Sequence, residues 1–168
     1  MIITLFRRVL WLIGILALQV LFFANLNIMG YATALVCPWF VLMMPQGIGR
    51  CEAMLWAFVL GLAADAFDNT PGLSAAAMTF AALLQPVAVN MLMTKDAIEG
   101  FTPSYKTMGK WGYIRLCAII LLCHHLLYYS LEAMTMAHFI DSALRAATGY
   151  ALSLLLILGL ELLRRPSQ

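Results

Sequence analysis

Long apolar runs separated by short polar stretches occupy almost the whole chain. A helix needs about 20 mainly apolar residues to cross the hydrocarbon core of a bilayer, with a range of about 17 to 25. The runs approach or reach this length, and polar or turn-forming residues bound each of them. The pattern predicts an all-α, polytopic membrane helix bundle with six transmembrane helices, at about residues 9–24, 31–44, 53–67, 73–93, 113–131 and 139–163.

Proline, glycine and polar residues mark the points at which these runs bend or end. Pro38 interrupts the second run, so we expect a kink or a broken helix there. Gln85-Pro86 lies inside the fourth run and predicts either a bend that packing tolerates or a kink whose free carbonyls line a cavity. The longest polar stretch, residues 94–112, predicts a loop with room for a short interfacial helix.

Composition places the chain in the membrane class. Hydrophobic residues make up 64% of the chain and charged residues 11%, whereas a soluble domain carries about 25% charged residues. No stretch is left over for a soluble domain, so residues 1–168 are expected to form a single transmembrane domain. The four cysteines form no C-x-x-C pair, and we expect them to fill space as small apolar side chains.

The positions of the charges predict the orientation. With a cytoplasmic N-terminus, nine of the ten Lys and Arg residues fall on the cytoplasmic side, and only Arg145 falls outside. Membrane proteins carry such an excess of positive charge inside, so both termini are expected to be cytoplasmic. The basic stretch from Lys95 to Lys110 is either a contact surface for cytoplasmic partners or anionic lipid, or a consequence of topology alone. The outer helix ends are acidic instead, with Asp65, Asp68, Glu132 and Asp141.

No set of residues with catalytic, metal-binding or phosphate-binding spacing stands out, so we expect a protein that is not an enzyme and needs no cofactor. The strongest candidate for function is the end of the third run. Asp65 is costly near the hydrocarbon, and Gly61, one turn earlier, allows another helix to approach closely. A structural role and a partner contact are both open for Asp65. Residues 68–72 are typical of a turn in which Asp68, Asn69 or Thr70 caps the next helix.

The fifth run carries a second group of polar side chains. Four of them recur on one helical stripe: His125, Tyr128, Tyr129 and Glu132. Glu132 lies at the outer end, as Asp65 does, so the two helices are placed to share a polar site. His124 and His125 point about 100° apart on a helix, which argues against a haem or metal site. Hydrogen bonding between helices is the expected use of these histidines.

Two sequence elements and the order of the spans are similar to one known family. The first element is Gly61-x-x-x-Asp65 leading into residues 69–72 (Asn-Thr-Pro-Gly). The second is a proline in the middle of the next span and then a His-His pair with a glutamate about two turns later, here Pro86, His124, His125 and Glu132. Over nearly the whole chain these features resemble MreD, the rod-shape-determining membrane proteins of bacteria, and most closely the Bacteroidetes-type members.

The resemblance implies a small six-span protein of the bacterial cytoplasmic (inner) membrane that belongs to the cell-wall elongation complex. MreD proteins bind MreC, a single-span protein with a large periplasmic domain. Through MreC they connect to the actin-like MreB filaments and to the glycosyltransferase and transpeptidase that build side-wall peptidoglycan. They are regarded as scaffolds or regulators of cell shape, without enzymatic activity and without a nucleic-acid partner.

The family fold is thought to be similar to the substrate-binding subunits of energy-coupling-factor vitamin transporters. This similarity supplies the alternative function, a small-molecule binding subunit of such a transporter. For the wall-elongation reading, the residues expected at partner contacts or polar intramembrane sites are Asp65, Asp68, Asn69, His125, Tyr128 and Glu132.

Overall fold

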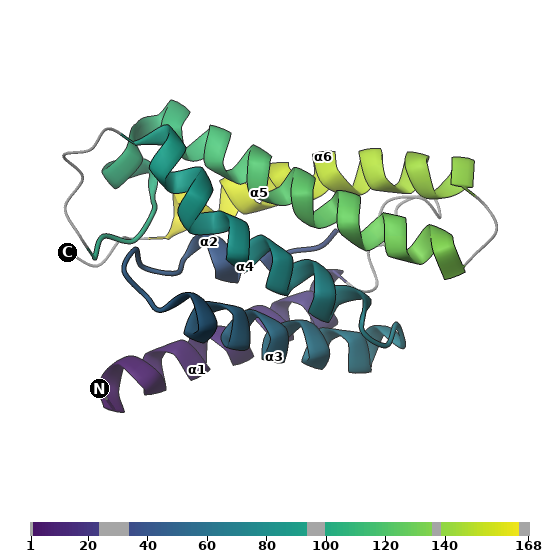
Figure 1. Ribbon diagram of the computed structural model, residues 1–168, viewed down its shortest axis with the longest axis horizontal. Helices are drawn as coiled ribbons and strands as arrows, with labels where there is room; N and C mark the ends of the chain where they lie inside the picture. The colour runs from purple at the N-terminus through teal and green to yellow at the C-terminus, as the bar shows by residue number, and fades with distance from the viewer. Residues whose placement is uncertain (1, 24–33, 94–99, 136–138, 165–168) are drawn as a thin grey trace.

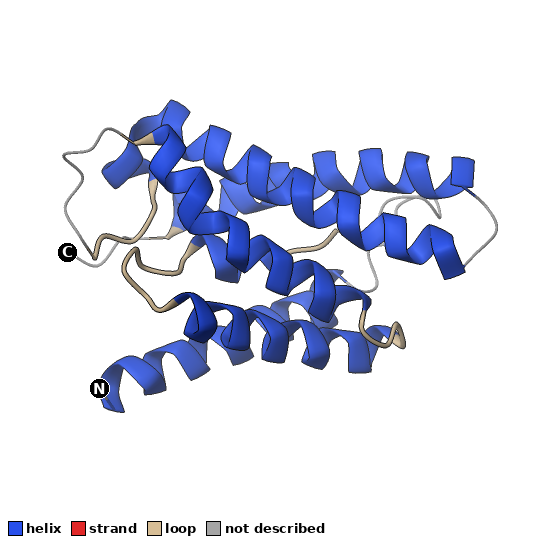
Figure 2. Ribbon diagram, in the orientation of Figure 1, coloured by secondary structure: helices blue, strands red, loops and turns tan. Residues whose placement is uncertain are grey.

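The computed structural model describes residues 2–23, 34–93, 100–135 and 139–164. Within these residues every regular element is a helix (Figure 2), which confirms the all-α class. The elements are α1 (Ile2–Leu18), its π-helical continuation η1 (Gln19–Phe23), α2 (Pro38–Leu42), α3 (Arg50–Asp68), α4 (Leu73–Leu92), α5 (Tyr105–Thr135) and α6 (Phe139–Leu163).

Length and composition mark three of the described helices as able to cross a membrane. They are Leu73–Leu92 in α4, Tyr105–Ala133 in α5 and Ala143–Leu163 in α6. Each exceeds the roughly 17 residues that a crossing requires. The coarse class, a helical membrane protein, therefore rests on the structure as well as on the composition.

Helices α3, α4, α5 and α6 run in alternating directions, and α1 runs in the same direction as α3 (Figure 1). Contacts join α3 to α4, α4 to α5 and α5 to α6. The first residues of α1 and the last residues of α6 lie at one end of the molecule, which we call the basal end. The turn between α3 and α4 lies at the opposite end, which we call the distal end.

Polar side chains are buried in this bundle, whereas large apolar side chains cover its outside. Leu62, Met91 and Leu155 are 51%, 80% and 70% exposed. The buried polar residues are Gln19, Asp65, Ser74, Gln85, Ser104, His124, His125, Ser153 and Glu161. A soluble protein shows the reverse preference, so this distribution fits helices that meet lipid on the outside and hydrogen-bond one another inside.

The second apolar run differs from the expected helix over residues 31–44. Its helical part, α2, has five residues, and residues 34–42 are buried throughout. Residues 31–33 lie outside the described part. Because Pro38 has no N–H to donate, a helix cannot continue through it, and Pro38 instead occupies the first turn of α2. The predicted break is thus present, and α2 contacts α1, α3, α4 and α5 at the centre of the bundle.

Side chains from distant helices satisfy the non-helical backbone before α2. The Gln19 amide donates to the Ala34 carbonyl (3.0 Å) and accepts from the Val36 N–H (2.7 Å). The Leu35 N–H donates to Ser153 Oγ (2.9 Å). Irregular backbone at membrane depth needs such partners, so Gln19 and Ser153 make the central position of this segment possible.

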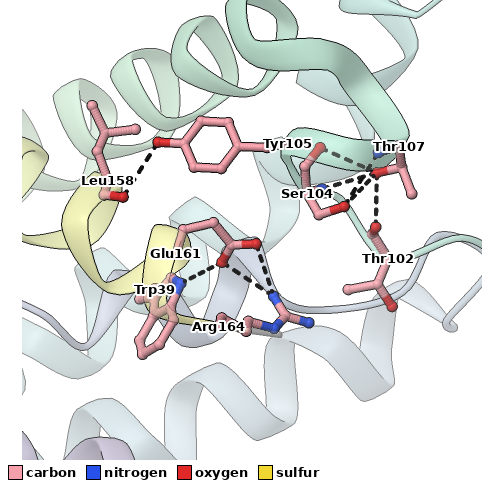
Figure 3. A network of polar contacts seen from close by, with 8 residues as sticks. All are labelled: Trp39, Thr102, Ser104, Tyr105, Thr107, Leu158, Glu161 and Arg164. Carbon is pink, nitrogen blue, oxygen red and sulfur yellow. Dashed lines mark hydrogen bonds and ion pairs between the residues drawn. The ribbon is translucent and has the colours of Figure 1, made fainter. Parts of the chain in front are cut away.

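Helical structure before the fifth run begins at Tyr105, inside the stretch 94–112 that was expected to be a loop with room for a short interfacial helix. Ser104 and Thr107 cap each other: the Ser104 N–H donates to Thr107 Oγ1 (2.9 Å) and the Thr107 N–H donates to Ser104 Oγ (3.2 Å) (Figure 3). The first turn then breaks at Gly109 (φ 71°, ψ 164°). Residues 94–99 of the expected loop lie outside the described part.

Candidate functional site

The Asp65 carboxylate forms the centre of the α3–α4 junction at the distal end. It is 3% exposed and accepts hydrogen bonds from the Ser74 N–H (2.8 Å), the Ala75 N–H (2.9 Å), the Gly72 N–H (3.1 Å) and the Thr70 hydroxyl (3.1 Å). The first N–H groups of a helix have no partner within the helix and favour a negative charge. We call Asp65 with these four donors the distal anchor.

The residue that caps the N-terminus of α4 differs from the one expected. No side chain of Asp68, Asn69 or Thr70 caps α4, and Gly72 stands at the N-cap without a side-chain hydrogen bond. The cap comes from Asp65, in the last turn of α3. Asn69 instead ends α3 in the left-handed conformation (φ 56°), which asparagine tolerates better than most residues.

Gly61 allows the close approach that the distal anchor requires. A Cβ atom at Gly61 would lie 2.6 Å from Ala75 Cα and 2.7 Å from the Ser74 carbonyl oxygen. Both atoms belong to the backbone of α4 and cannot move aside as a flexible side chain can. The expected close contact at Gly61 is therefore confirmed, and its partner is the first turn of α4.

Thr70 links the distal anchor to α5. Its hydroxyl donates to Asp65, and its side chain lies close to Tyr128 of α5. Asp68 and Glu132 both act electrostatically on Tyr128, and Glu132 Oε2 is buried without a hydrogen-bond partner among the described residues. Asp68 and Glu132 thus both lie near Tyr128, whereas Asp65, which was expected to share a polar site with Glu132, is engaged by the α4 N-terminus and the turn before it.

His125 joins α5 to α6 and, through Ser153, to the segment before α2. Its Nδ1 lies 2.9 Å from the Leu121 carbonyl oxygen, and its Nε2 lies 3.3 Å from Ser153 Oγ. A proton on Nδ1 satisfies the carbonyl and leaves Nε2 to accept from Ser153. Ser153 in turn accepts from the Leu35 N–H. The expected hydrogen bonding of a histidine between helices is therefore present.

His124 differs from its neighbour. It is 1% exposed, and neither ring nitrogen has a hydrogen-bond partner in the described part of the chain. Its ring stacks on Tyr128, with centroids 6.3 Å apart. Among the described residues, no group of three or more His, Cys, Asp or Glu side chains is placed to hold a metal ion.

A second buried carboxylate, at the basal end, was not predicted from the sequence. Glu161 is 4% exposed; it accepts from the Trp39 indole N–H (3.1 Å) and pairs with Arg164 (3.3 Å) (Figure 3). Trp11 packs edge-on against Trp39 at 6.0 Å, and Arg164 lies 6.0 Å from the centre of the Trp11 ring. We call Glu161, Trp39 and Arg164 the basal anchor. Its sequence signal was the lone glutamate in the last apolar run.

Comparison with known proteins adds no identification. No family model, no curated protein and no solved structure matches the chain. The class that the fold defines is that of a helical membrane protein, and the resemblance to MreD stays a prediction from the sequence.

Proposed function

We propose that this protein is a non-enzymatic, MreD-type membrane component of the bacterial cell-wall elongation complex. In this role it binds an MreC-type single-span protein and helps to control cell shape and side-wall peptidoglycan synthesis. The observation that carries the proposal is the distal anchor. Gly61 and Asp65, on which the resemblance rests, fix the α3–α4 junction by a clash-free backbone contact and four hydrogen bonds.

The topology proposed with this function has six crossings of the cytoplasmic membrane and cytoplasmic termini. Helix α3 has 19 residues, about 28 Å, and α1 with η1 is longer, against a hydrocarbon core of about 30 Å. The segment containing α2 supplies the remaining crossing as a broken helix buried in protein, which is how membrane proteins accommodate irregular backbone. Basic residues near the basal end, such as Arg8, Lys106 and Arg164, support a cytoplasmic basal end.

The distal end supplies the proposed partner surface. Asp65 is unsuited to contact a partner, because its oxygens are buried and engaged by α4 and the preceding turn. The side chains of Asp68 and Glu132, by contrast, are both partly exposed. Of the three carboxylates expected at the partner contact, Asp68 and Glu132 therefore remain candidates, and they favour a basic group on the partner.

Co-purification tests the proposal. The protein is co-expressed with the MreC-type protein of the same organism, one copy is tagged, and the eluate is examined by gel filtration in detergent. We expect a stable complex with the wild type. The double variant Asp68→Asn/Glu132→Gln should retain at most about one fifth of the partner, since charge pairs at interfaces contribute about 1 kcal/mol or more. The control variant is Glu52→Gln, which removes a carboxylate at the basal end and should retain as much of the partner as the wild type.

Failure of two well-folded proteins to associate would overturn the proposal. The alternative is a small-molecule binding subunit of the energy-coupling-factor transporter type, and His124 favours it. A buried ring with two unpartnered nitrogens costs about 1–3 kcal/mol, which a polar ligand can recover. Mass spectrometry of the denatured purified protein would then show a stoichiometric small molecule that His124→Phe fails to retain.

A further inference from the structure

One face of α5 carries an exposed stripe that begins with a tryptophan and an arginine. Trp111 is 75% exposed, and Arg115, one turn further, is exposed as well. Residues four apart lie on the same face of a helix. The stripe continues with Ile119, Leu122 and Leu126, which are 40%, 54% and 66% exposed. A positively charged side chain thus lies within an apolar, outward-facing surface.

Arg115 differs from two other arginines near the basal end. Arg8 pairs with Glu52, and Arg164 pairs with Glu161. For Arg115 the described residues supply neither an ion pair nor a hydrogen bond. A guanidinium group carries five N–H donors and is costly to leave unpaired beside hydrocarbon. The described residues therefore leave the charge of Arg115 open to a partner from its surroundings.

The depth of Arg115 identifies that partner. Arg115 lies six residues, or about 9 Å along the helix axis, from the break at Gly109. Side chains on a helix tilt toward its N-terminus, so the guanidinium group extends back toward Trp111 and the basal end. Tryptophan favours the level of the lipid headgroups, and long basic side chains extend to the same level.

We propose that Arg115 and Trp111 form a binding site for an anionic phospholipid in the leaflet at the basal end. Two parallel N–H groups of the guanidinium bind the lipid phosphate, the Trp111 indole lies beside the headgroup, and one acyl chain follows Ile119, Leu122 and Leu126. The occupant is a lipid because the face beyond Arg115 is apolar and matches an acyl chain. This site is independent of the proposed function.

Native mass spectrometry tests the site. The purified protein is titrated with an equimolar mixture of phosphatidylglycerol and phosphatidylethanolamine, and the apparent Kd of each lipid is measured. We expect the wild type to prefer phosphatidylglycerol. Arg115→Gln should weaken phosphatidylglycerol binding about tenfold, as the loss of a charge-assisted bidentate contact does. The Kd of Arg115→Lys for phosphatidylglycerol should lie between the values for the wild type and Arg115→Gln, because lysine keeps the charge without the planar guanidinium group.

Two further variants control for general effects of charge and of the aromatic ring. Lys110 is also exposed and basic, but lies about 140° around the helix from Arg115, so Lys110→Gln should change the Kd less than twofold. Trp111→Leu should weaken binding about threefold. The proposal is overturned if Arg115→Gln binds phosphatidylglycerol like the wild type, or if the wild type shows no lipid preference. Loss of a co-purifying protein from Arg115→Gln, with lipid binding intact, would also overturn it and assign the stripe to a protein partner.

Discussion

The two buried carboxylates hold opposite ends of the bundle by different means. At the distal end, the Asp65 carboxylate accepts from four groups that follow it by five to ten residues in the chain. At the basal end, Glu161 accepts from Trp39, 122 residues earlier, and pairs with Arg164, which directly follows the end of α6. Asp65 compensates its charge with the N-terminus of a helix, whereas Glu161 uses a cation.

The two carboxylates show two ways in which a membrane helix bundle stabilises a buried charge. A local anchor such as Asp65 joins helices that are already consecutive, so it fixes the angle of one hairpin. A long-range anchor such as Glu161 connects the last helix to the buried α2 segment and so fixes the position of α6 against the centre of the bundle. Hydrogen bonds to charged groups contribute about 1.5–3 kcal/mol each, so both anchors are expected to matter for stability.

The largest effect is expected from removing the distal anchor. Asp65→Ala leaves the Ser74 and Ala75 N–H groups buried without partners, which should lower the free energy of unfolding by about 4 kcal/mol. Thermal unfolding in detergent, followed by gel filtration, measures this loss. Thr70→Val removes only one of the four donors and should cost about 1 kcal/mol. Equal losses for the two variants would show that Asp65 does not act through the α4 backbone.

A methyl group at Gly61 should separate α3 from α4. Gly61→Ala places a Cβ atom 2.6 Å from Ala75 Cα, and overpacking of this kind costs about 3 kcal/mol. The same thermal assay measures the change. The matched control is Gly14→Ala in α1, where no atom lies within 4 Å of the new Cβ, so the variant should unfold at or above the wild-type temperature. An unfolding temperature of Gly61→Ala equal to that of the wild type would contradict the close contact between α3 and α4.

The basal anchor should show a smaller effect. Glu161→Gln keeps an oxygen that can accept from the Trp39 N–H, but it loses the charge that pairs with Arg164, and we expect a cost of about 1–2 kcal/mol. A double-mutant cycle with Arg164→Gln isolates the ion pair. A coupling energy indistinguishable from zero would assign the stabilisation to Trp39 alone.

The smallest effect is expected from the exposed ion pair between α1 and α3. Arg8 pairs with Glu52, and the Glu52 side chain is 50% exposed. Solvent screens such pairs, which contribute about 0–1 kcal/mol. Arg8→Gln should therefore leave the unfolding temperature nearly unchanged. A loss as large as that of Glu161→Gln would place the Arg8–Glu52 pair among the anchors of the fold.

Some features of the fold could be read from the sequence because their causes are local. The fourth and sixth helices begin and end where the apolar runs predicted, at Leu73–Leu92 and Phe139–Leu163. Pro38 breaks its run as expected because the missing N–H acts wherever the residue lies. The close approach at Gly61 was also predictable, because a glycine one turn before a buried aspartate leaves space for a neighbouring backbone.

What the sequence determined by itself was therefore the helical membrane class, the helix boundaries at strong turns and the pairing of neighbours across the α3–α4 turn. The tertiary structure decided which polar side chains form hydrogen bonds with the buried polar groups of the interior. It assigned the α4 cap to Asp65 in place of the turn residues, Gln19 and Ser153 to the backbone before α2, and Trp39 to Glu161. Periodicity places a residue on a helix face, but the partner on a distant segment depends on how the helices pack, and no local pattern encodes that choice.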